Sequence, residues 1–213
     1  RTEATLVFDK GNVSDDAMED LVVSPMHFVA ALAADRAADL LATPIDRFEP
    51  VAGAPGTRAF VTTTDHWSTT CRAAVVYTES FFTQQLNGVT ANLVKCQKKL
   101  SDLAKSLDRW RQGKGRGKRP TLAGVKKSVR SILSPQFMKE LVIADLQGGS
   151  EAPTLTYHVD HQALDRLTRE RLGRTVLVTN HRDWNAERII AAYRGLSSIE
   201  ESFKNMKNVD YLR

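Results

Sequence analysis

The longest regular pattern of apolar positions lies in the middle of the chain. Apolar residues recur there at alternating spacings of four and three, with Lys, Asp, Gln and Ser between them. They are Phe82, Leu86, Val89, Leu93, Cys96, Leu100, Leu103, Leu107 and Trp110. An α-helix brings residues at these spacings onto one side. The pattern predicts a long helix that ends at the Gly-, Lys- and Arg-rich stretch 113–120.

A second helical pattern follows that stretch directly. Its apolar positions are Leu122, Val125, Val129 and Ile132. Two helices with a short connection usually pack antiparallel. We therefore expect a helical hairpin over about 79–133, with a basic, glycine-rich tip.

The N-terminal residues favour strands and a helix in alternation. A short apolar run, 6–8, ends at Asp9, and Ser14 can cap a helix that begins in the acidic pair Asp15 and Asp16. The run 27–32 is a second apolar stretch of strand length. Strand, helix and strand with a carboxylate at the tip of the first strand are typical of α/β architecture.

The other segments give shorter signals. Residues 43–70 are rich in Pro, Gly and Thr and predict loops with one or two short strands, whereas 72–77 is a clearer strand. Further strands are expected at 141–144, 155–159 and 175–179, with a short helix over 161–172. Asn185 can cap a final helix that carries Ile189, Ile190 and Tyr193.

The charge is strongly asymmetric. Residues 1–50 hold four basic and ten acidic side chains, a net of −6, whereas 95–130 hold thirteen basic and two acidic, a net of +11. A local basic concentration is the electrostatic footprint of a phosphate-binding surface. The tip residues Arg116, Lys118 and Arg119 are therefore candidate DNA contacts, although a solvated charged loop is the simpler alternative. The tryptophans could stack on bases, but Trp110 fits better at the end of the heptad seam.

Composition narrows the class of protein. No apolar run reaches about 18 residues, so we expect no membrane-spanning segment and no membrane partner. Cys71 and Cys96 lack metal-binding spacing and suggest buried thiols in a reducing compartment. Walker, GxGxxG and GxSxG motifs are missing from the sequence. The chain begins with Arg1 and a strand follows almost at once, so we expect a fragment of a longer protein.

One carboxylate stands out near the C-terminus. Tyr193, Leu196, Glu200, Phe203 and Lys207 would share one side of a helix, and Glu200 lies in the middle of that side. A carboxylate facing a core is costly unless it is paired. An ion pair with the lysine four residues on is the plain explanation. The alternative is that Glu200 and Asp9 share a divalent metal, for which oxygen ligands favour Mg²⁺.

Two of these stretches carry a family resemblance. Residues 6–12 resemble the strand that bears the second aspartate of a DDE transposase. Residues 193–207 resemble the signature of one bacterial insertion-sequence group: Tyr, two residues, Arg, three residues, Glu, six residues, Lys. Tyr193, Glu200 and Lys207 occupy those spacings, whereas Leu196 stands at the Arg position, with Arg194 nearby.

The resemblance implies a fold and a chemistry. The fold is α/β: a partial ribonuclease-H-like core, 1–42 and 181–213, interrupted by an α+β insertion over 43–180 that contains the helical hairpin. Three carboxylates would bind two Mg²⁺ ions, cleave double-stranded DNA at transposon ends and direct strand transfer into target DNA. Asp9 and Glu200 would be catalytic metal ligands, and the first aspartate would lie upstream of Arg1. Tyr193, Lys207 and Arg194 would contact DNA.

The resemblance also suggests a setting: a bacterial or archaeal cytoplasm, close to the nucleoid, with a homodimer on DNA as one arrangement. Two other functions remain open from the residues. The chain could be a catalytically inactive relic of a transposase that still binds DNA through the basic tip. It could also be a structural protein that associates with itself through the coiled-coil seam of 82–110.

Overall fold

A computed structural model describes residues 4–9, 11, 14–148 and 152–195. These divide into two compact units, each described separately below. Unit 1 comprises Arg1–Phe82 and Glu170–Arg213, and unit 2 comprises Thr83–Arg169. The chain is a mixed α/β protein, as the sequence predicts. None of its helices in the described ranges combines the length and apolar character needed to cross a lipid bilayer.

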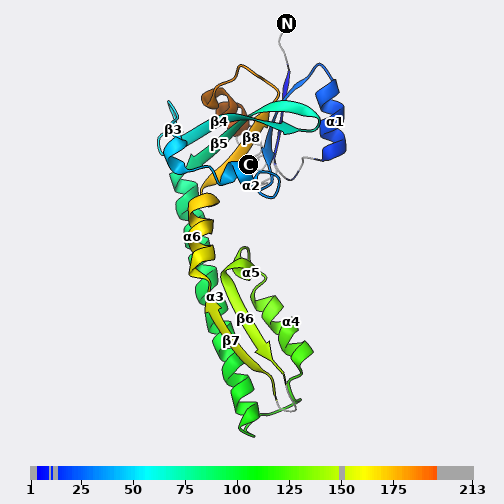
Figure 1. Ribbon diagram of the computed structural model, residues 1–213, viewed down its shortest axis with the longest axis vertical. Coiled ribbons are helices and arrows are strands. Elements are labelled where there is room, and N and C mark those ends of the chain that lie inside the picture. The colour runs from blue at the N-terminus through cyan, green and yellow to red at the C-terminus, as the bar shows by residue number, and fades with distance from the viewer. Residues whose placement is uncertain (1–3, 10, 12–13, 149–151, 196–213) are drawn as a thin grey trace, which may run out of the picture. The chain divides into compact units, whose positions relative to one another are not determined.

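Unit 1 is built on a six-stranded mixed sheet in the order β1-β2-β8-β5-β4-β3 (Figure 1). Only β1 and β2 run parallel, and each of the other neighbouring pairs is antiparallel. The strands are β1 (Thr5–Phe8), β2 (His27–Leu32), β3 (Glu49–Pro50), β4 (Thr57–His66), β5 (Thr69–Thr78) and β8 (Arg174–Thr179).

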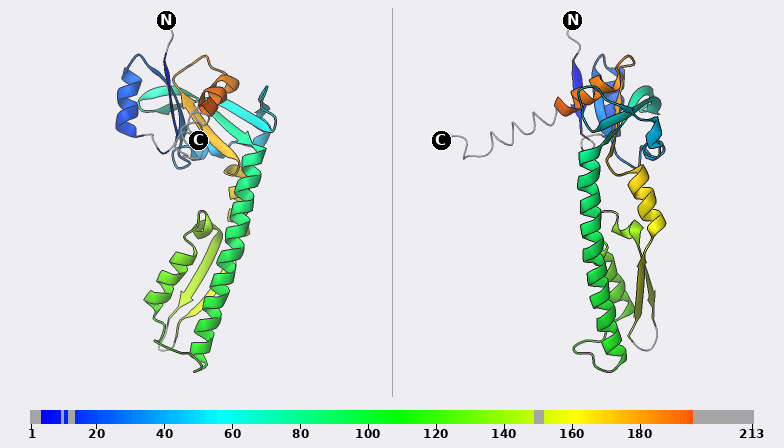
Figure 2. Two further views of the ribbon diagram at one scale, coloured as in Figure 1. Left: turned by 180° about the vertical axis from the view of Figure 1, so that it is seen from behind. Right: turned by 90° about the vertical axis from the view of Figure 1, so that its left-hand side faces the viewer.

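Helices cover both faces of this sheet (Figures 1 and 2). On one face α1 (Asp15–Val23) and α2 (Ala38–Leu41) pack, with the 3-10 turn η1 (Ile45–Arg47) following α2. On the other face lies the helix formed by 186–195, which buries Ile189 and Ile190. A strand covered on both faces needs apolar residues throughout, which explains the continuous apolar runs of β2 and β8.

The β1–α1–β2 segment forms as the sequence predicts. Ser14 caps α1, since its Oγ accepts a hydrogen bond from the amide of Ala17 at 3.4 Å. Met18 and Leu21, three residues apart, point from α1 into the core. The helix links two parallel strands, so the carboxyl ends of β1 and β2 lie at the same edge of the sheet.

Unit 2 combines helices with a β-hairpin. The long helix α3 (Glu79–Arg111) begins in unit 1 and supplies most of its length to unit 2. The remaining elements are α4 (Leu122–Ile132), α5 (Met138–Leu141), β6 (Val142–Gln147), β7 (Thr154–Val159) and α6 (His161–Glu170).

The hairpin of β6 and β7 lies against α3 and α4 (Figures 1 and 2). Burial alternates along both strands, so one face is covered and the other is open to solvent. The Sγ of Cys96 on α3 lies 3.1 Å from the carbonyl oxygen of Ile132 at the end of α4. The two predicted helices, α3 and α4, are confirmed. The β-hairpin of β6 and β7 packs with them in unit 2.

The expected insertion boundaries, 43–180, differ from the observed division. The units separate between Phe82 and Thr83 and again between Arg169 and Glu170. The reason is strand pairing: β5 and β8 pair with each other, and β8 pairs with β2. Residues expected in the insertion therefore build most of the sheet of unit 1.

Candidate functional site

The structure brings Asp9 and Tyr193 together in unit 1. Asp9 directly follows β1 at the edge where the parallel pair ends, and Tyr193 lies in the helix 186–195. The Tyr193 hydroxyl donates a hydrogen bond to Asp9 Oδ1 at 2.8 Å. The contact is partly buried, and the tyrosine ring packs beside the core that includes Ile189 and Ile190. Tyr193, the first residue of the second stretch that carries the resemblance, therefore meets Asp9 of the first.

The helix that carries Tyr193 is positioned by its cap and by its apolar side. Asn185 Oδ1 accepts from the amide of Arg188 at 3.0 Å, which confirms the predicted cap. Ile189 and Tyr193, four residues apart, face the same sheet surface. The direction of the helix thus follows from its apolar residues, and Tyr193 reaches Asp9 as a result.

Arg194 has a different environment from Tyr193. Its guanidinium donates from Nη2 to Thr57 Oγ1 at 3.1 Å, and Thr57 is buried at the start of β4. This contact ties the helix to the sheet. The residue remains exposed overall, so a role in binding DNA stays a prediction.

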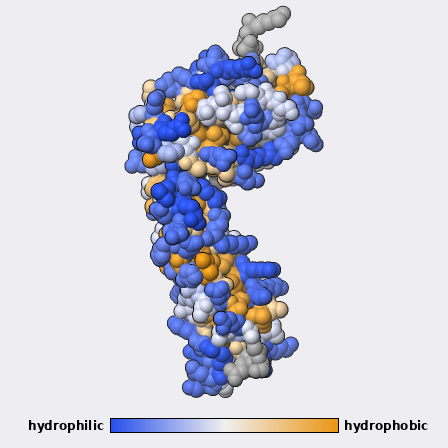
Figure 3. Space-filling model, in the orientation of Figure 1, coloured by the Kyte–Doolittle hydropathy of each residue, from blue (hydrophilic) through white to orange (hydrophobic). Residues whose placement is uncertain are grey.

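Other predicted site residues belong to unit 2 or are not described. Glu200 and Lys207 lie outside the described residues. Arg116, Lys118 and Arg119 are exposed in the loop between α3 and α4, which belongs to unit 2. The lower end of unit 2 in Figure 3 is mostly hydrophilic.

A Mg²⁺ ion at Asp9 would need several oxygen ligands close together. A carboxylate such as that of Asp9 suits Mg²⁺. Over the described residues, no group of three or more His, Cys, Asp or Glu side chains could hold a metal ion. Asp9 therefore fits the donor chemistry, but no cluster of three such donors surrounds it among the described residues.

Two of the tryptophans that could stack on bases are engaged within unit 1. Trp67 is 8% exposed and donates from Nε1 to Asp15 Oδ1 at 3.0 Å. That carboxylate also accepts from Arg36 at 2.8 Å, and the two donors, Arg36 first, hold the pKa of Asp15 below its usual range. Trp67 thus belongs to the core and its polar edge.

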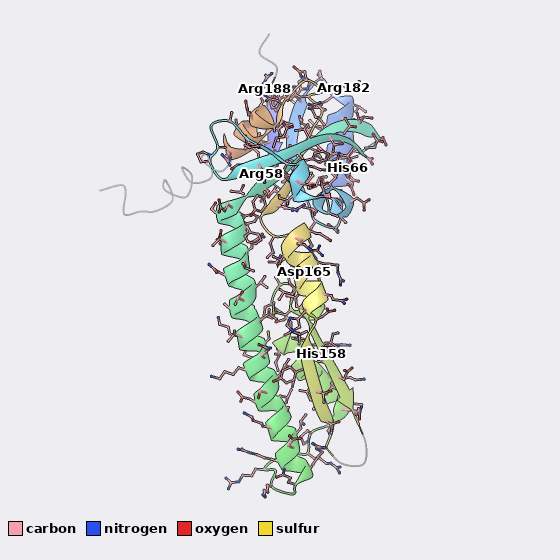
Figure 4. All side chains as sticks on the ribbon, turned by 60° about the vertical axis from the view of Figure 1, so that its left-hand side comes forward. Arg58, His66, His158, Asp165, Arg182 and Arg188 are labelled. Carbon is pink, nitrogen blue, oxygen red and sulfur yellow. The ribbon has the colours of Figure 1, made fainter. Side chains whose placement is uncertain are left out.

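Trp184 belongs to a column of rings that the sequence did not indicate. The ring of His181 stacks on Trp184 at 3.8 Å and on His27 at 3.9 Å, and Arg188 lies over the indole at 4.8 Å. Arg188, labelled in Figure 4, belongs to the helix 186–195. With a ring on one side and a guanidinium near the other, Trp184 is not placed to stack on a base.

The cysteines behave as the sequence predicts. Both are free thiols and both are buried. Burial raises the pKa of the Cys71 thiol to about 11, and it also raises that of Cys96. Such thiols are poor nucleophiles and poor metal ligands.

The chain was compared with known proteins once this geometry was established. No protein-family model, no curated protein and no solved structure matches it. Its function is therefore inferred from its residues and their arrangement.

Proposed function

We propose that this chain is part of a Mg²⁺-dependent DNA transposase of the DDE type. The observation that carries the proposal is the 2.8 Å hydrogen bond from Tyr193 to Asp9. It joins the strand that resembles the second aspartate of the family to the helix on which the Tyr/Arg/Glu/Lys signature begins. These two stretches are 184 residues apart in the sequence.

The proposed fold of unit 1 is a partial ribonuclease-H-like core. Its support is the β1–α1–β2 segment, a parallel pair with Asp9 at the carboxyl end of the first strand. Functional residues of α/β sheets gather at that edge. The segment Thr83–Arg169, which forms unit 2, is consistent with an insertion in such a core.

Each proposed site residue has a role. Asp9 and Glu200 would hold Mg²⁺, which supplies charge stabilisation and an activated water in hydrolysis of a phosphodiester. Tyr193 keeps the carboxylate of Asp9 in one orientation, as outer hydrogen-bond donors do for metal ligands. Lys207 and Arg194 would neutralise DNA phosphates. The family set requires a third carboxylate in addition to Asp9 and Glu200.

The self-associating coiled coil is less favoured than either DNA-binding reading. All nine residues of the α3 seam are buried or half-buried within this one chain. Val89, Cys96, Leu100 and Leu107 are the most deeply buried of them. A seam that the chain covers itself offers little apolar surface to a second copy.

Nicking of DNA tests the proposal. The protein is expressed from the start of its reading frame and incubated with Mg²⁺ and a supercoiled plasmid that carries the DNA flanking the coding region. We expect nicked circles, and we expect Glu200→Gln to remove them while DNA affinity is retained. Binding without nicking in the unsubstituted protein would instead support the inactive relic.

A further inference from the structure

The basic tip of unit 2 begins with an ordered helix end. The amide of Lys114 donates to the carbonyl of Arg109 at 2.9 Å, and the amide of Gly113 donates to that of Trp110 at 3.0 Å. Gly113 has a φ of +72°. This pair of bonds around a left-handed glycine is a Schellman motif, which ends α3 and turns the chain back. The first residues of the loop are thus fixed by the backbone.

Gly115 then lies directly on the indole of Trp110. A Cβ atom at Gly115 would come within 2.1 to 2.5 Å of three atoms of that ring. Any larger residue would have to move the loop or the indole. The glycine therefore permits a close contact that holds the main chain against the last turn of α3.

This arrangement borders an open pocket of about 480 Å³. Three of its lining side chains are cations, one is a hydroxyl and one is the indole, with Gly115 completing the wall. The lining residues are Ser106, Arg109, Trp110, Lys114, Gly115 and Arg116.

The charge of the pocket is not balanced by its own walls. No carboxylate is among the described residues that line it. The nearby Asp108 forms an ion pair with Arg111, which is not a lining residue. A pocket lined by three cationic side chains, with no acid among its described lining residues, favours a group with more than one negative oxygen.

We propose that this pocket is a specific seat for a phosphate of a DNA strand. Arg109, Lys114 and Arg116 would bind the phosphate oxygens, and Ser106 could add a hydrogen bond. The inference rests on the proposed function only in taking DNA as the partner, and it does not depend on Asp9 or on cleavage. A specific phosphate site differs from non-specific attraction by a basic loop. Cations that line the pocket should contribute more to DNA affinity than cations elsewhere on unit 2.

A pair of charge-matched variants tests this. In one, Arg109, Lys114 and Arg116 are changed to Gln. In the control, the exposed residues Lys95, Lys98 and Lys99 of α3 are changed to Gln, which removes the same formal charge. Affinity for a fluorescently labelled 30-bp duplex is measured by anisotropy from low to moderate salt.

The pocket variant should bind about tenfold more weakly at moderate salt, with a log–log salt slope reduced by about one. The control should lose less than about threefold. Equal losses in the two variants would contradict the proposal, because they would mean that only net charge counts. Circular dichroism and thermal unfolding confirm that both variants fold.

A third variant keeps the charge and changes only the shape. Gly115→Ala places a methyl group where the Trp110 ring lies, so the loop must shift. Because the net charge is unchanged, any loss comes from the shape of the pocket. We expect the affinity to fall at least threefold, both for the duplex and for a single strand of the same sequence. Binding equal to that of the unsubstituted protein would overturn the proposal.

Failure here and failure of the proposed function give different results. If the pocket is not a phosphate seat, Mg²⁺-dependent nicking should still depend on Asp9. If the chain is not a nuclease, nicking is absent but the difference between the two charge-matched variants remains.

Discussion

The hydroxyl of Tyr193 donates a hydrogen bond to Asp9, with Oη and Oδ1 2.8 Å apart, although the two residues are separated by 184 positions in the sequence. The tyrosine belongs to a helix capped by Asn185, and the aspartate to the end of a strand that pairs only with β2 among the described strands. The apolar residues of the helix set its direction, and the pairing of β1 with β2 places Asp9 where the tyrosine reaches it. The hydrogen bond is the physical link between the two halves of the proposed site.

Removal of the Tyr193 hydroxyl should weaken both stability and cleavage. Tyr193→Phe is expected to lower the free energy of unfolding by about 1 kcal/mol and Mg²⁺-dependent nicking by about tenfold, as for partners of metal ligands. Urea unfolding and plasmid nicking measure the two effects.

The matched control for this variant is Tyr157→Phe. That hydroxyl donates to the carbonyl of Gln97 at 3.3 Å within unit 2. It should affect stability modestly and leave nicking unchanged. An equal loss of nicking in the two variants would remove Tyr193 from the site.

The guanidinium of Arg174 should be essential to the fold of unit 1. Arg174 is 8% exposed, donates to the carbonyls of Leu41 and Thr43, at 2.6 and 2.5 Å, and lies over the ring of Phe48 at 5.0 Å. Arg174→Met keeps much of the volume but leaves two buried carbonyls without this donor. We expect a loss of about 2–4 kcal/mol in urea unfolding. A loss below 0.5 kcal/mol would show that the contacts are replaceable.

The thiols should be protected until the protein unfolds. Since burial raises the pKa of Cys71 to about 11, little thiolate exists at pH 8. Ellman's reagent should therefore label Cys71 and Cys96 slowly in the native protein and rapidly in urea. Variants with one Cys changed to Ala assign each rate, and rapid native labelling of Cys71 would contradict its burial.

His66, at the end of β4 (Figure 4), should make stability depend on pH. Burial, and then the charge of Arg36, lower the pKa of His66 in the folded protein. In the unfolded chain it titrates near about 6.5, so between these two values the unfolded chain binds more protons. The contribution of neutral His66 to the free energy of unfolding is fully present above pH ~6.5 and is lost as the pH falls toward the lowered pKa.

His66→Gln should therefore flatten the rise in urea midpoint as the pH approaches about 6.5 from below. The matched substitution His158→Gln, at an exposed position of β7, is measured beside it. A slope unchanged by His66→Gln would place the pH dependence elsewhere.

The sequence allowed accurate prediction of elements whose pattern is local. The heptad spacing from Phe82 to Trp110 predicted α3, and the cap at Ser14 predicted α1, because both depend on neighbours within a few residues. The long strand β4 was expected only as short pieces. Its turn to β5 uses Trp67 and Ser68, both with positive φ and neither a typical residue for such a turn.

Long-range relationships could not be predicted in the same way. The pairing of β8 with β2 and β5 joins segments far apart in sequence, which is why the division into units was expected at 42 and 180. The pocket at the tip also has no sequence motif. The alternation of Gly with Lys and Arg gave the charge, but only the folded loop, with Gly115 against Trp110, shows that Arg109, Lys114 and Arg116 line one pocket.

Cleavage by an Asp9→Asn variant tests the central claim most directly. This change keeps the size and the hydrogen-bonding oxygen of the side chain but removes the negative charge that a metal ion needs. The proposed site predicts that nicking in Mg²⁺ falls at least about 100-fold, while affinity for the labelled duplex and the urea midpoint change little. Nicking at the unsubstituted rate would show that Asp9 is not a metal ligand and would contradict the account.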